Sequence, residues 1–553
     1  MPRRTAEEAP PGYTLLADTR SPSLLGRLLV TVHQVTALLA GSVLSWSRSH
    51  AGDTSVSALR RGIAWTAALI IRPFIRRDLR DQPFPVQLRR RLELLGPTYI
   101  KLGQILSLRD DILPKPITDE LRNLLDRLPV VPYSTFCELV EKSLDRPIGA
   151  MFAEVEKVPL GSASIAQIHR ATTIQGDVVV IKAVKPGIRD TLTRDTVILR
   201  GVGLTLQLVF ARYQPYKIIN EFCEYTLREV DLRREADNGD IFAANFANEP
   251  DVHFPRIFHD CSSRDVLVME YLEGLRPDSR KAKALPLADR EKLVDLGVGS
   301  IIEMIYRDGF FHADLHPGNL VILPGPKVGY IDLGMVGRLE NDLRRSLLYY
   351  YYSLVTGDAD NAARYLAAVA QPGPGGDPDG FRREVAEISG RWKRAATFED
   401  FSLAQLTLES VSKGGEYRMY FPMELVLMVK TLITYESVGH MLVPGFDVAE
   451  VSRRHVRRVF IAQFSPLRLV QEELRGAPDL VDALMKVPSL VTEGLRVLER
   501  STKRPADNPL AGIRGTLLAG FALVAGAIVF AFHGPAIVWI LLVLASLLLA
   551  GRR

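Results

Sequence analysis

Three polar residues near the middle of the chain, Asp314, Asn319 and Asp332, have the types and spacing that phosphoryl transfer requires. Asp314 lies five residues before Asn319 in the loop His312-Ala-Asp-Leu-His-Pro-Gly-Asn319, and Asp332 follows Asn319 by 13 residues. Carboxylate and amide oxygens can hold Mg²⁺ against nucleotide phosphates, and a nearby carboxylate can receive the proton of an attacking hydroxyl. Each residue alone is typical of an ordinary turn. Both intervals together predict Asp314 as the catalytic carboxylate and Asn319 and Asp332 as metal ligands.

A β-hairpin between Asn319 and Asp332 would place these two side chains next to each other. Two short apolar segments, residues 320–323 and 328–331, are joined by Pro324-Gly-Pro, which is typical of a turn. Because the open ends of a hairpin meet, we expect the amide of Asn319 and the carboxylate of Asp332 to share one site.

A lysine at the end of an apolar strand is predicted to contact the nucleotide. Residues 164–171 and 178–184 have the pattern of two strands with a turn at Gly176-Asp177. Lys182 in the second strand matches the position at which protein kinases contact the α and β phosphates, so we assign it a catalytic and nucleotide-binding role. The alternative is an edge-strand lysine that extends into solvent.

A carboxylate must hold such a lysine, and the helical pattern of residues 224–235 can supply one. Asp231 and Glu235 are one turn apart and share a face of the predicted helix, whereas Glu229 lies about a third of a turn away. A solvated charged face would have the same pattern. The partner of Lys182 therefore stays open at this point.

Two further segments are predicted to line a nucleotide pocket. Residues 266–272 form an apolar strand that leads into a polar loop, where Glu270 and Leu272 lie at the position from which backbone groups bind adenine. The loop before the lysine strand has small residues, but only one glycine, in place of a glycine-rich phosphate loop. Its residues are Gly161, Ser162, Ala163 and Ser164.

The composition excludes several classes of protein. A length of 553 residues is too great for one core, and 69 Lys plus Arg against 64 Asp plus Glu gives a net charge of only +5. So small an excess does not indicate a nucleic-acid-binding protein. Three widely spaced cysteines fit a reducing compartment and exclude a disulfide scaffold, and His312 and His316 have no accompanying zinc spacing. We therefore expect the catalytic region to face the cytoplasm.

The C-terminus is predicted to form a transmembrane hairpin. Residues 515–532 and 536–550 are uncharged runs separated by His533-Gly-Pro, and arginines flank both outer ends. A buried helical hairpin is the alternative. Small residues four apart within the first run suit close helix contact, which predicts a homodimer through the hairpin. Near the N-terminus, residues 24–46 fit an interfacial or protein-packed helix better than a membrane span.

The predicted fold class is α+β, a two-lobed atypical protein-kinase-like fold with an N-terminal helical extension and a C-terminal transmembrane hairpin. A polar segment with apolar or interfacial helices is expected at 1–85, and a helical extension at 86–150. The small lobe is expected at 151–275, the large lobe at 276–505, and the hairpin at 510–553.

One upstream segment, Lys101-Leu-Gly-Gln104, has no counterpart in an ordinary protein kinase. In combination with the loop His312-Ala-Asp-Leu-His-Pro-Gly-Asn319 it resembles the UbiB or AarF family of atypical kinases. The resemblance covers about residues 87–340 and includes Glu229, Asp231 and Glu235. The chain departs from the family pattern where its phosphate loop begins Gly161-Ser162 and not with a run of alanines, so ATP and ADP both remain candidate nucleotides.

The resemblance implies an enzyme that binds ATP or ADP with Mg²⁺, hydrolyses ATP and supports ubiquinone biosynthesis. Lys101 and Gln104 would reach the nucleotide site, supported by Glu229 and Asp231, and Glu235 would pair with Lys182. It also implies a location on the cytoplasmic side of the bacterial inner membrane. Membrane lipids or prenyl-quinone precursors, and other quinone-biosynthesis enzymes, would be its partners.

Three functions remain open from the sequence. The first is a membrane-anchored kinase or ATPase that acts on or extracts lipid precursors and does not phosphorylate proteins. The second is a small-molecule kinase of the aminoglycoside or choline kinase type, which uses a similar catalytic loop but does not explain Lys101-Leu-Gly-Gln104. The third is a nucleotide-binding scaffold without turnover.

Overall fold

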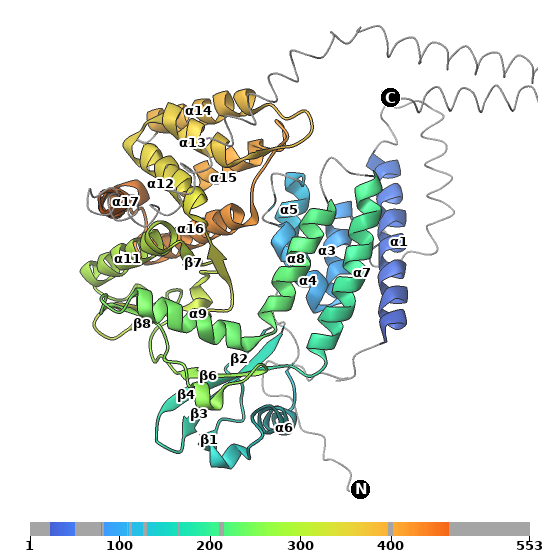
Figure 1. Ribbon diagram of the computed structural model, residues 1–553, viewed down its shortest axis with the longest axis vertical. Coiled ribbons are helices and arrows are strands. Elements are labelled where there is room, and N and C mark those ends of the chain that lie inside the picture. Colours follow the sequence, from blue (N-terminus) through green and yellow to red (C-terminus); the bar gives the residue numbers. More distant parts are fainter. Residues whose placement is uncertain are drawn as a thin grey trace, which may run out of the picture. The chain divides into compact units, whose positions relative to one another are not determined.

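The computed structural model describes residues 23–49, 79, 82–107, 109, 113–124, 130–163, 165–209, 215–395 and 402–463. The chain divides into two compact units, Met1–Gln463 and Phe464–Arg553, and every described residue belongs to the first. The predicted transmembrane hairpin and Ser164 lie outside the described residues. The first unit is a helix-rich α+β structure, as predicted (Figure 1).

A five-stranded antiparallel sheet contains the predicted lysine strand. Its order is β1–β3–β4–β6, with β2 beside β3. The strands are β1 (Phe152–Val155), β2 (Gly161–Ser162), β3 (Ala166–Thr173), β4 (Val178–Val184) and β6 (Val266–Glu270). Lys182 of β4 lies opposite Ile168 of β3 and Leu267 of β6, so it belongs to an interior strand. This register excludes the alternative of an edge-strand lysine.

Helices cover both faces of β4, which explains its continuous apolar sequence. On one face Val179 and Ile181 belong to a core cluster with Phe136 of α6 (Tyr133–Leu144). On the other face Val180 packs in a cluster with side chains of α7 (Ile188–Val209) and α9 (Leu232–Asn245). Because side chains alternate across a strand, Lys182 lies on the same face as Val180 and points to α9.

The N-terminal helices pack in one group with α7 and α8 (Pro215–Glu229) (Figure 1). They are α1 (Leu24–Ser49), α3 (Phe84–Leu95), α4 (Pro97–Leu106) and α5 (Lys115–Leu121), which share a core with α7 and α8. Gly96, with a φ of 97°, separates α3 from α4 in a conformation that favours glycine.

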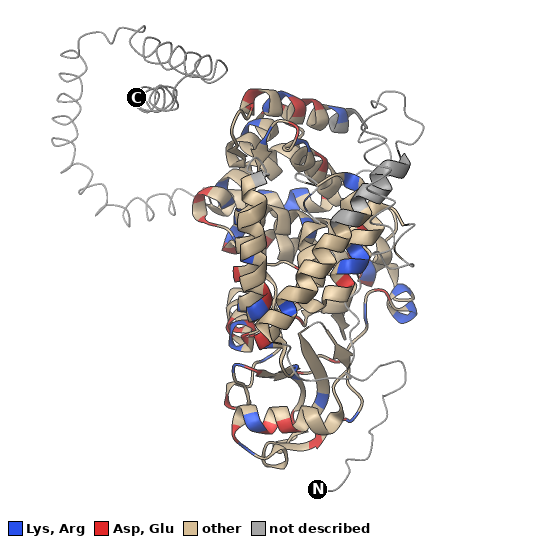
Figure 2. Cartoon of the chain, turned by 90° about the vertical axis from the view of Figure 1, so that its right-hand side faces the viewer, with Lys and Arg blue, Asp and Glu red and all other residues tan. Residues whose placement is uncertain are grey.

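One face of α1 packs against the rest of the protein, and the opposite face is exposed. Arg27 forms an ion pair of 2.5 Å with Asp195 of α7, whereas Leu25 and Leu29 are 65% and 62% exposed. Charged side chains are sparse along the helices on this side of the molecule (Figure 2). The structure thus agrees with the prediction of an interfacial or protein-packed helix at 24–46.

The larger lobe is mainly helical. Its helices are α10 (Arg280–Lys283), α11 (Leu287–Ile302), which continues as a π-helix at Glu303–Asp308, α12 (Asn341–Thr356), α13 (Ala359–Val369), α14 (Pro378–Ala395), α15 (Leu403–Lys413), α16 (Met423–Leu442) and α17 (Val448–Gln463). Its short strands are β5 (Val252–His253), β7 (Phe310–His312), β8 (Leu320–Leu323), β9 (Lys327–Tyr330), β10 (Val336–Arg338), β11 (Gln371–Pro372) and β12 (Met419–Tyr420).

Helix α16 is the core helix of this lobe. Among the described residues it alone is long and apolar enough to cross a membrane, and 61% of its most apolar window is buried within the protein. It packs against α11 and α15. Burial among these helices accounts for its apolar composition without a membrane.

Candidate active site

The predicted hairpin is confirmed, and it brings Asn319 and Asp332 together. Strands β8 and β9 are antiparallel, with Leu320 opposite Tyr330. Beyond that pair, the N–H of Ile331 donates to the carbonyl of Asn319 at 3.1 Å. Asp332 is therefore the next residue past the open end of the hairpin, directly beside Asn319.

Lys182 lies between two carboxylates. Its Nζ is 2.8 Å from Oε1 of Glu235 and 3.3 Å from Oδ1 of Asp332. Burial alone would lower the pKa of the Lys182 ammonium, but the charges of Asp332 and Glu235 outweigh burial and raise this pKa. Although 41% of the Asp332 side chain is accessible from the cavity, the surrounding protein disfavours its ionisation, yet the Lys182 charge holds the pKa of Asp332 well below its usual range. Both groups are thus charged at neutral pH, as phosphate and metal binding require.

Asn319 and Asp332 each present an oxygen suited to Mg²⁺. The side-chain amide of Asn319 donates through Nδ2 to the carbonyl of Asp314 at 2.9 Å, which leaves Oδ1 without a donor among the described residues. Oδ1 of Asp332 accepts from Lys182 and from the N–H of Gly334 at 3.2 Å, which leaves Oδ2 for a metal ion. The described chain has no cluster of three His, Cys, Asp or Glu residues that could hold a metal. Mg²⁺ would therefore need phosphate oxygens and water as its other ligands, as is common for Mg²⁺ in nucleotide-binding sites.

Asp314 has a partner that sequence reasoning missed. Nζ of Lys430, from α16, lies 2.8 Å from Oδ1 of Asp314, and Nε2 of His316 lies 3.9 Å from Oδ2. Burial would raise the pKa of Asp314, but the Lys430 charge lowers it below its ordinary value. Lys430 is the only lysine or arginine in α16. A lone cation in an otherwise apolar helix was the signal that could have revealed it.

His312 plays a structural part in the catalytic loop. It is fully buried, and its Nδ1 accepts the N–H of Asp314 at 3.1 Å, which fixes the start of the loop. Burial lowers the pKa of His312 to about 4. Its imidazole is therefore neutral at physiological pH.

We expect the protein to lose stability as the pH falls from about 6.5 to about 4. The His312 imidazole titrates near 6.5 in the unfolded chain but stays neutral to about 4 in the fold. The unfolded state binds more protons in this window, so the free energy of unfolding decreases as the pH is lowered. His312→Asn keeps an acceptor for Asp314 and should flatten the dependence, measured by urea unfolding with EDTA present. An equally steep dependence in the variant would contradict this assignment.

The residues predicted to carry phosphoryl transfer line one cavity of about 960 Å³. The structure brings most of the predicted site residues to this cavity: Lys101, Gln104, Gly161, Ser162, Ala163, Lys182, Glu229, Glu235, Asp314, Asn319 and Asp332. Lys101 of α4 forms an ion pair with Glu229 of α8. Nζ of Lys185, just after β4, donates to the carbonyl of Ala163 at 2.7 Å and holds the phosphate loop. The N-terminal extension and the phosphate loop thus share the walls of one site.

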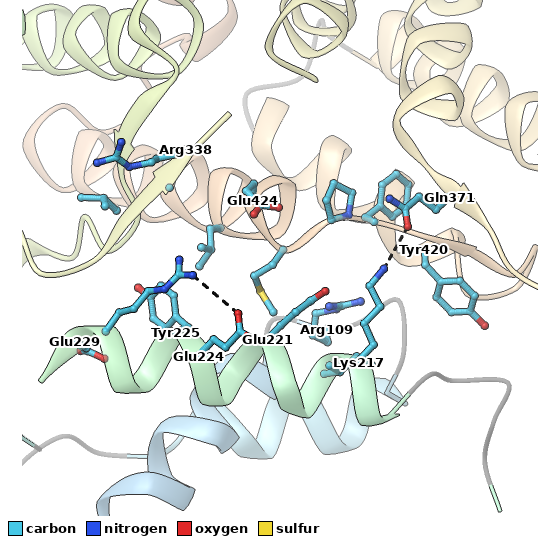
Figure 3. A pocket seen from close by; sticks show the side chains of 18 of the residues that line it. Arg109, Lys217, Glu221, Glu224, Tyr225, Glu229, Arg338, Gln371, Tyr420 and Glu424 are labelled. Carbon is cyan, nitrogen blue, oxygen red and sulfur yellow. Dashed lines mark hydrogen bonds and ion pairs between the residues drawn. The ribbon is translucent and has the colours of Figure 1, made fainter. Parts of the chain in front are cut away.

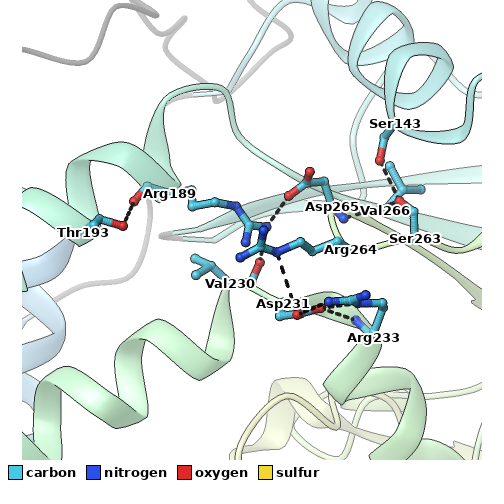
Figure 4. Close-up of polar contacts among 10 residues, drawn as sticks. All are labelled: Ser143, Arg189, Thr193, Val230, Asp231, Arg233, Ser263, Arg264, Asp265 and Val266. Atoms are coloured by element: carbon cyan, nitrogen blue, oxygen red, sulfur yellow. Dashed lines mark hydrogen bonds and ion pairs between the residues drawn. The ribbon is translucent and has the colours of Figure 1, made fainter.

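Asp231 does not line this cavity. The chain breaks after α8, and the predicted single helix at 224–235 is wrong because Asp231 is the N-cap of a new helix, α9. Its carboxylate accepts the N–H of Arg233 at 3.3 Å and pairs with the side chains of Arg233 and Arg264 at 2.7 and 3.8 Å (Figure 4). The Asp231 carboxylate, which was predicted to support Lys101, therefore caps the N-terminus of α9 instead.

Glu270 and Leu272 also lie outside the cavity lining. Oε2 of Glu270 accepts the N–H of Arg256 at 3.1 Å and lies 3.3 Å from Nε2 of His253. Leu272 is buried and packs over Gly329 of β9. Both side chains thus make contacts outside the cavity, and adenine binding by their backbone stays a prediction.

A second cavity of about 540 Å³ adjoins the first and shares Glu229, Gly334 and Leu427 with it. Its walls come from α8, β10 and the start of α16. Figure 3 shows Lys217 of α8 reaching toward Gln371 across this cavity, a contact of 3.4 Å. Sequence reasoning did not predict it, and its mixture of acidic and basic side chains indicates no particular ligand.

Comparison with known proteins places the chain in a family. Residues 123–366 match the ABC1 atypical kinase-like domain, and residues 394–447 match the UbiB helical domain. A protein of Cellvibrio japonicus (strain Ueda107) named probable protein kinase UbiB is 32% identical over 424 residues, which are 75% of this chain and 76% of that protein. The chain belongs to the UbiB family of atypical kinases. The segment that matches the UbiB helical domain contains α16 and therefore Lys430.

UbiB-family membership confirms the resemblance found in the sequence and implies a role in ubiquinone biosynthesis. The kinase-like domain implies ATP binding, typically with Mg²⁺. Among solved structures, Rv3197 of Mycobacterium tuberculosis in complex with erythromycin is similar at a TM-score of 0.42 and 22% identity. That match covers 64% of this chain and 94% of the solved chain.

Proposed function

We propose that this protein is a membrane-anchored atypical kinase or ATPase that binds Mg²⁺–ATP and supports prenyl-quinone synthesis. Its phosphoryl acceptor is a lipid precursor or water, and not a protein. The observation that carries this proposal is the mixed lining of the 960 Å³ cavity, which has both charged and aliphatic side chains. Its lining includes Lys182, Asp314 and Asp332, and it also includes a set of aliphatic side chains.

The aliphatic walls suit a prenyl chain. Five of their side chains come from α15 and α16, and three from α4 and the segment around α5: Leu408, Val411, Val426, Val429, Ile433, Ile105, Leu121 and Leu124. Burial of apolar surface favours a hydrocarbon chain here, with its hydroxyl or ring directed to Asp314. Because α4 also lines the site through Lys101 and Gln104, an extended protein segment has less room than a slender lipid.

The charged residues of the cavity supply the parts of phosphoryl transfer. Lys182 binds the α and β phosphates, and Asp314 accepts the proton of the attacking hydroxyl. Asn319 and Asp332 would hold Mg²⁺, which neutralises charge on the phosphates when bound. The predicted hairpin at 510–553 anchors this unit on the cytoplasmic side of the bacterial inner membrane and forms the homodimer contact, and other quinone-biosynthesis enzymes assemble with it.

Deletion of the gene followed by quinone profiling tests the pathway. We expect ubiquinone to fall and a prenylated precursor to accumulate, with recovery on expression of the wild-type chain but not of Asp314→Asn. Purified protein in lipid vesicles should hydrolyse ATP only with Mg²⁺. Unchanged quinones would reject the pathway, whereas recovery by Asp314→Asn would favour a scaffold without turnover.

A further inference from the structure

Helix α16 delivers a lysine to the catalytic carboxylate. Nζ of Lys430 lies 2.8 Å from Oδ1 of Asp314, and Lys430 lines the same cavity as Lys182 and the metal-binding pair. The next residue, Thr431, is buried and donates through Oγ1 to the carbonyl of His312 at 2.9 Å. This bond ties the register of α16 to the strand that leads into the catalytic loop. The position of Lys430 is thus set by the fold.

Among the four lysines that line the cavity, Lys182 and Lys430 belong to opposite lobes and have different partners. Lys182 comes from β4 and is held by Glu235 and Asp332. Lys430 comes from α16, and Asp314 is its ion-pair partner. An acceptor hydroxyl bound to Asp314 must attack the terminal phosphate in line with the leaving oxygen. A cation within hydrogen-bond distance of Asp314 is therefore placed to meet the terminal phosphate.

We propose that Lys430 binds the γ-phosphate of ATP and is the residue by which this cavity distinguishes ATP from ADP. The inference rests on the proposed nucleotide-binding function. The alternative to phosphate binding is that Lys430 and Asp314 form a purely structural ion pair. An aliphatic side chain would then suit this mainly apolar helix better than a lysine, whose charge must be solvated. Lys430 also lines the cavity, so in addition to Asp314 its ammonium can meet an anionic ligand bound there.

The chemistry requires no change in the charge of Lys430. During transfer the bond from the β-phosphate oxygen to the γ-phosphorus breaks, and a bond from the acceptor oxygen to the same phosphorus forms. The acceptor proton goes to Asp314, and ADP leaves with the electron pair. The Lys430 ammonium keeps its protons throughout and stabilises the charge on the transferred oxygens. ADP lacks these oxygens, so it gains nothing from Lys430.

The test compares Mg²⁺–ATP and Mg²⁺–ADP binding to the full chain by calorimetry. Lys430→Met should bind ATP about 10-fold more weakly, the effect of one lost ionic hydrogen bond, and ADP within about twofold of wild type. Its kcat for ATP hydrolysis should fall about 10²-fold. Lys430→Arg, which keeps the charge, should recover most of the ATP preference. Lys413→Met is the matched control, because Lys413 pairs with Glu416 at 2.8 Å on the surface of α15, outside the cavity.

The outcomes separate this inference from the proposed function. A wild-type ratio of ATP to ADP affinity in Lys430→Met, or an equal loss for both nucleotides, would overturn the Lys430 assignment alone. A wild-type chain that binds neither nucleotide would overturn the proposed function together with it. Lys430→Gln removes the charge but keeps a polar side chain, and the same loss is expected of it. A folding defect confined to the Met variant therefore leaves the test intact.

Discussion

Asp332→Asn is expected to lower the rate of ATP hydrolysis about 10³-fold, at the upper end of the effect of losing one transition-state-stabilising group. The substitution removes the carboxylate charge that would hold Mg²⁺ and that pairs with Lys182 at 3.3 Å. The fold should survive, because Asn keeps a side-chain oxygen to accept the N–H of Gly334. Release of inorganic phosphate by purified protein in vesicles, over a range of Mg²⁺ concentrations, measures the effect.

A matched substitution on the surface controls for general loss of charge. Asp278 pairs with Arg276 at 2.8 Å and is as exposed as Asp332, at 41%, but lies outside the cavity. Asp278→Asn should therefore hydrolyse ATP at the wild-type rate. If Asp332→Asn retained activity within about tenfold of wild type, Asp332 would not be a metal ligand in this protein.

The parts of the site that could be predicted from sequence are those set by local geometry. The hairpin between Asn319 and Asp332 depends only on two short strands and a turn, and the strand that carries Lys182 is an apolar run next to a turn. These features require neighbours in sequence, which the pattern of residues reports directly.

The parts that sequence reasoning missed depend on where a helix begins and on distant packing. Asp231 was expected to share a face with Glu235, but it caps α9, and only Glu235 faces Lys182. Helix boundaries are decided by single capping contacts, which a charge pattern does not resolve. Lys430 lies 116 residues from Asp314, and its approach depends on how α16 packs against β7, the strand that leads into the loop of Asp314.

Lys182→Met is expected to lower the free energy of unfolding by about 3–5 kcal/mol, the usual effect of removing one partner of a buried ion pair. Glu235 has only 5% of its side chain exposed, and burial already raises its pKa despite the Lys182 charge. Without the lysine, the Glu235 carboxylate must either stay charged in the interior or take up a proton. Chemical denaturation at neutral pH, with Mg²⁺ and nucleotide absent, measures the loss.

Adding Glu235→Gln to Lys182→Met separates the structural role of the ion pair from its role in the site. The double variant has no buried charge at position 235, so most of the lost stability should return. Mg²⁺–ATP affinity should not return, because no cation remains on β4 to meet the α and β phosphates. If the double variant were as unstable as Lys182→Met, packing of the lysine stem and not its charge would hold β4 against α9. Recovery of both properties would instead show that nucleotide binding does not depend on Lys182.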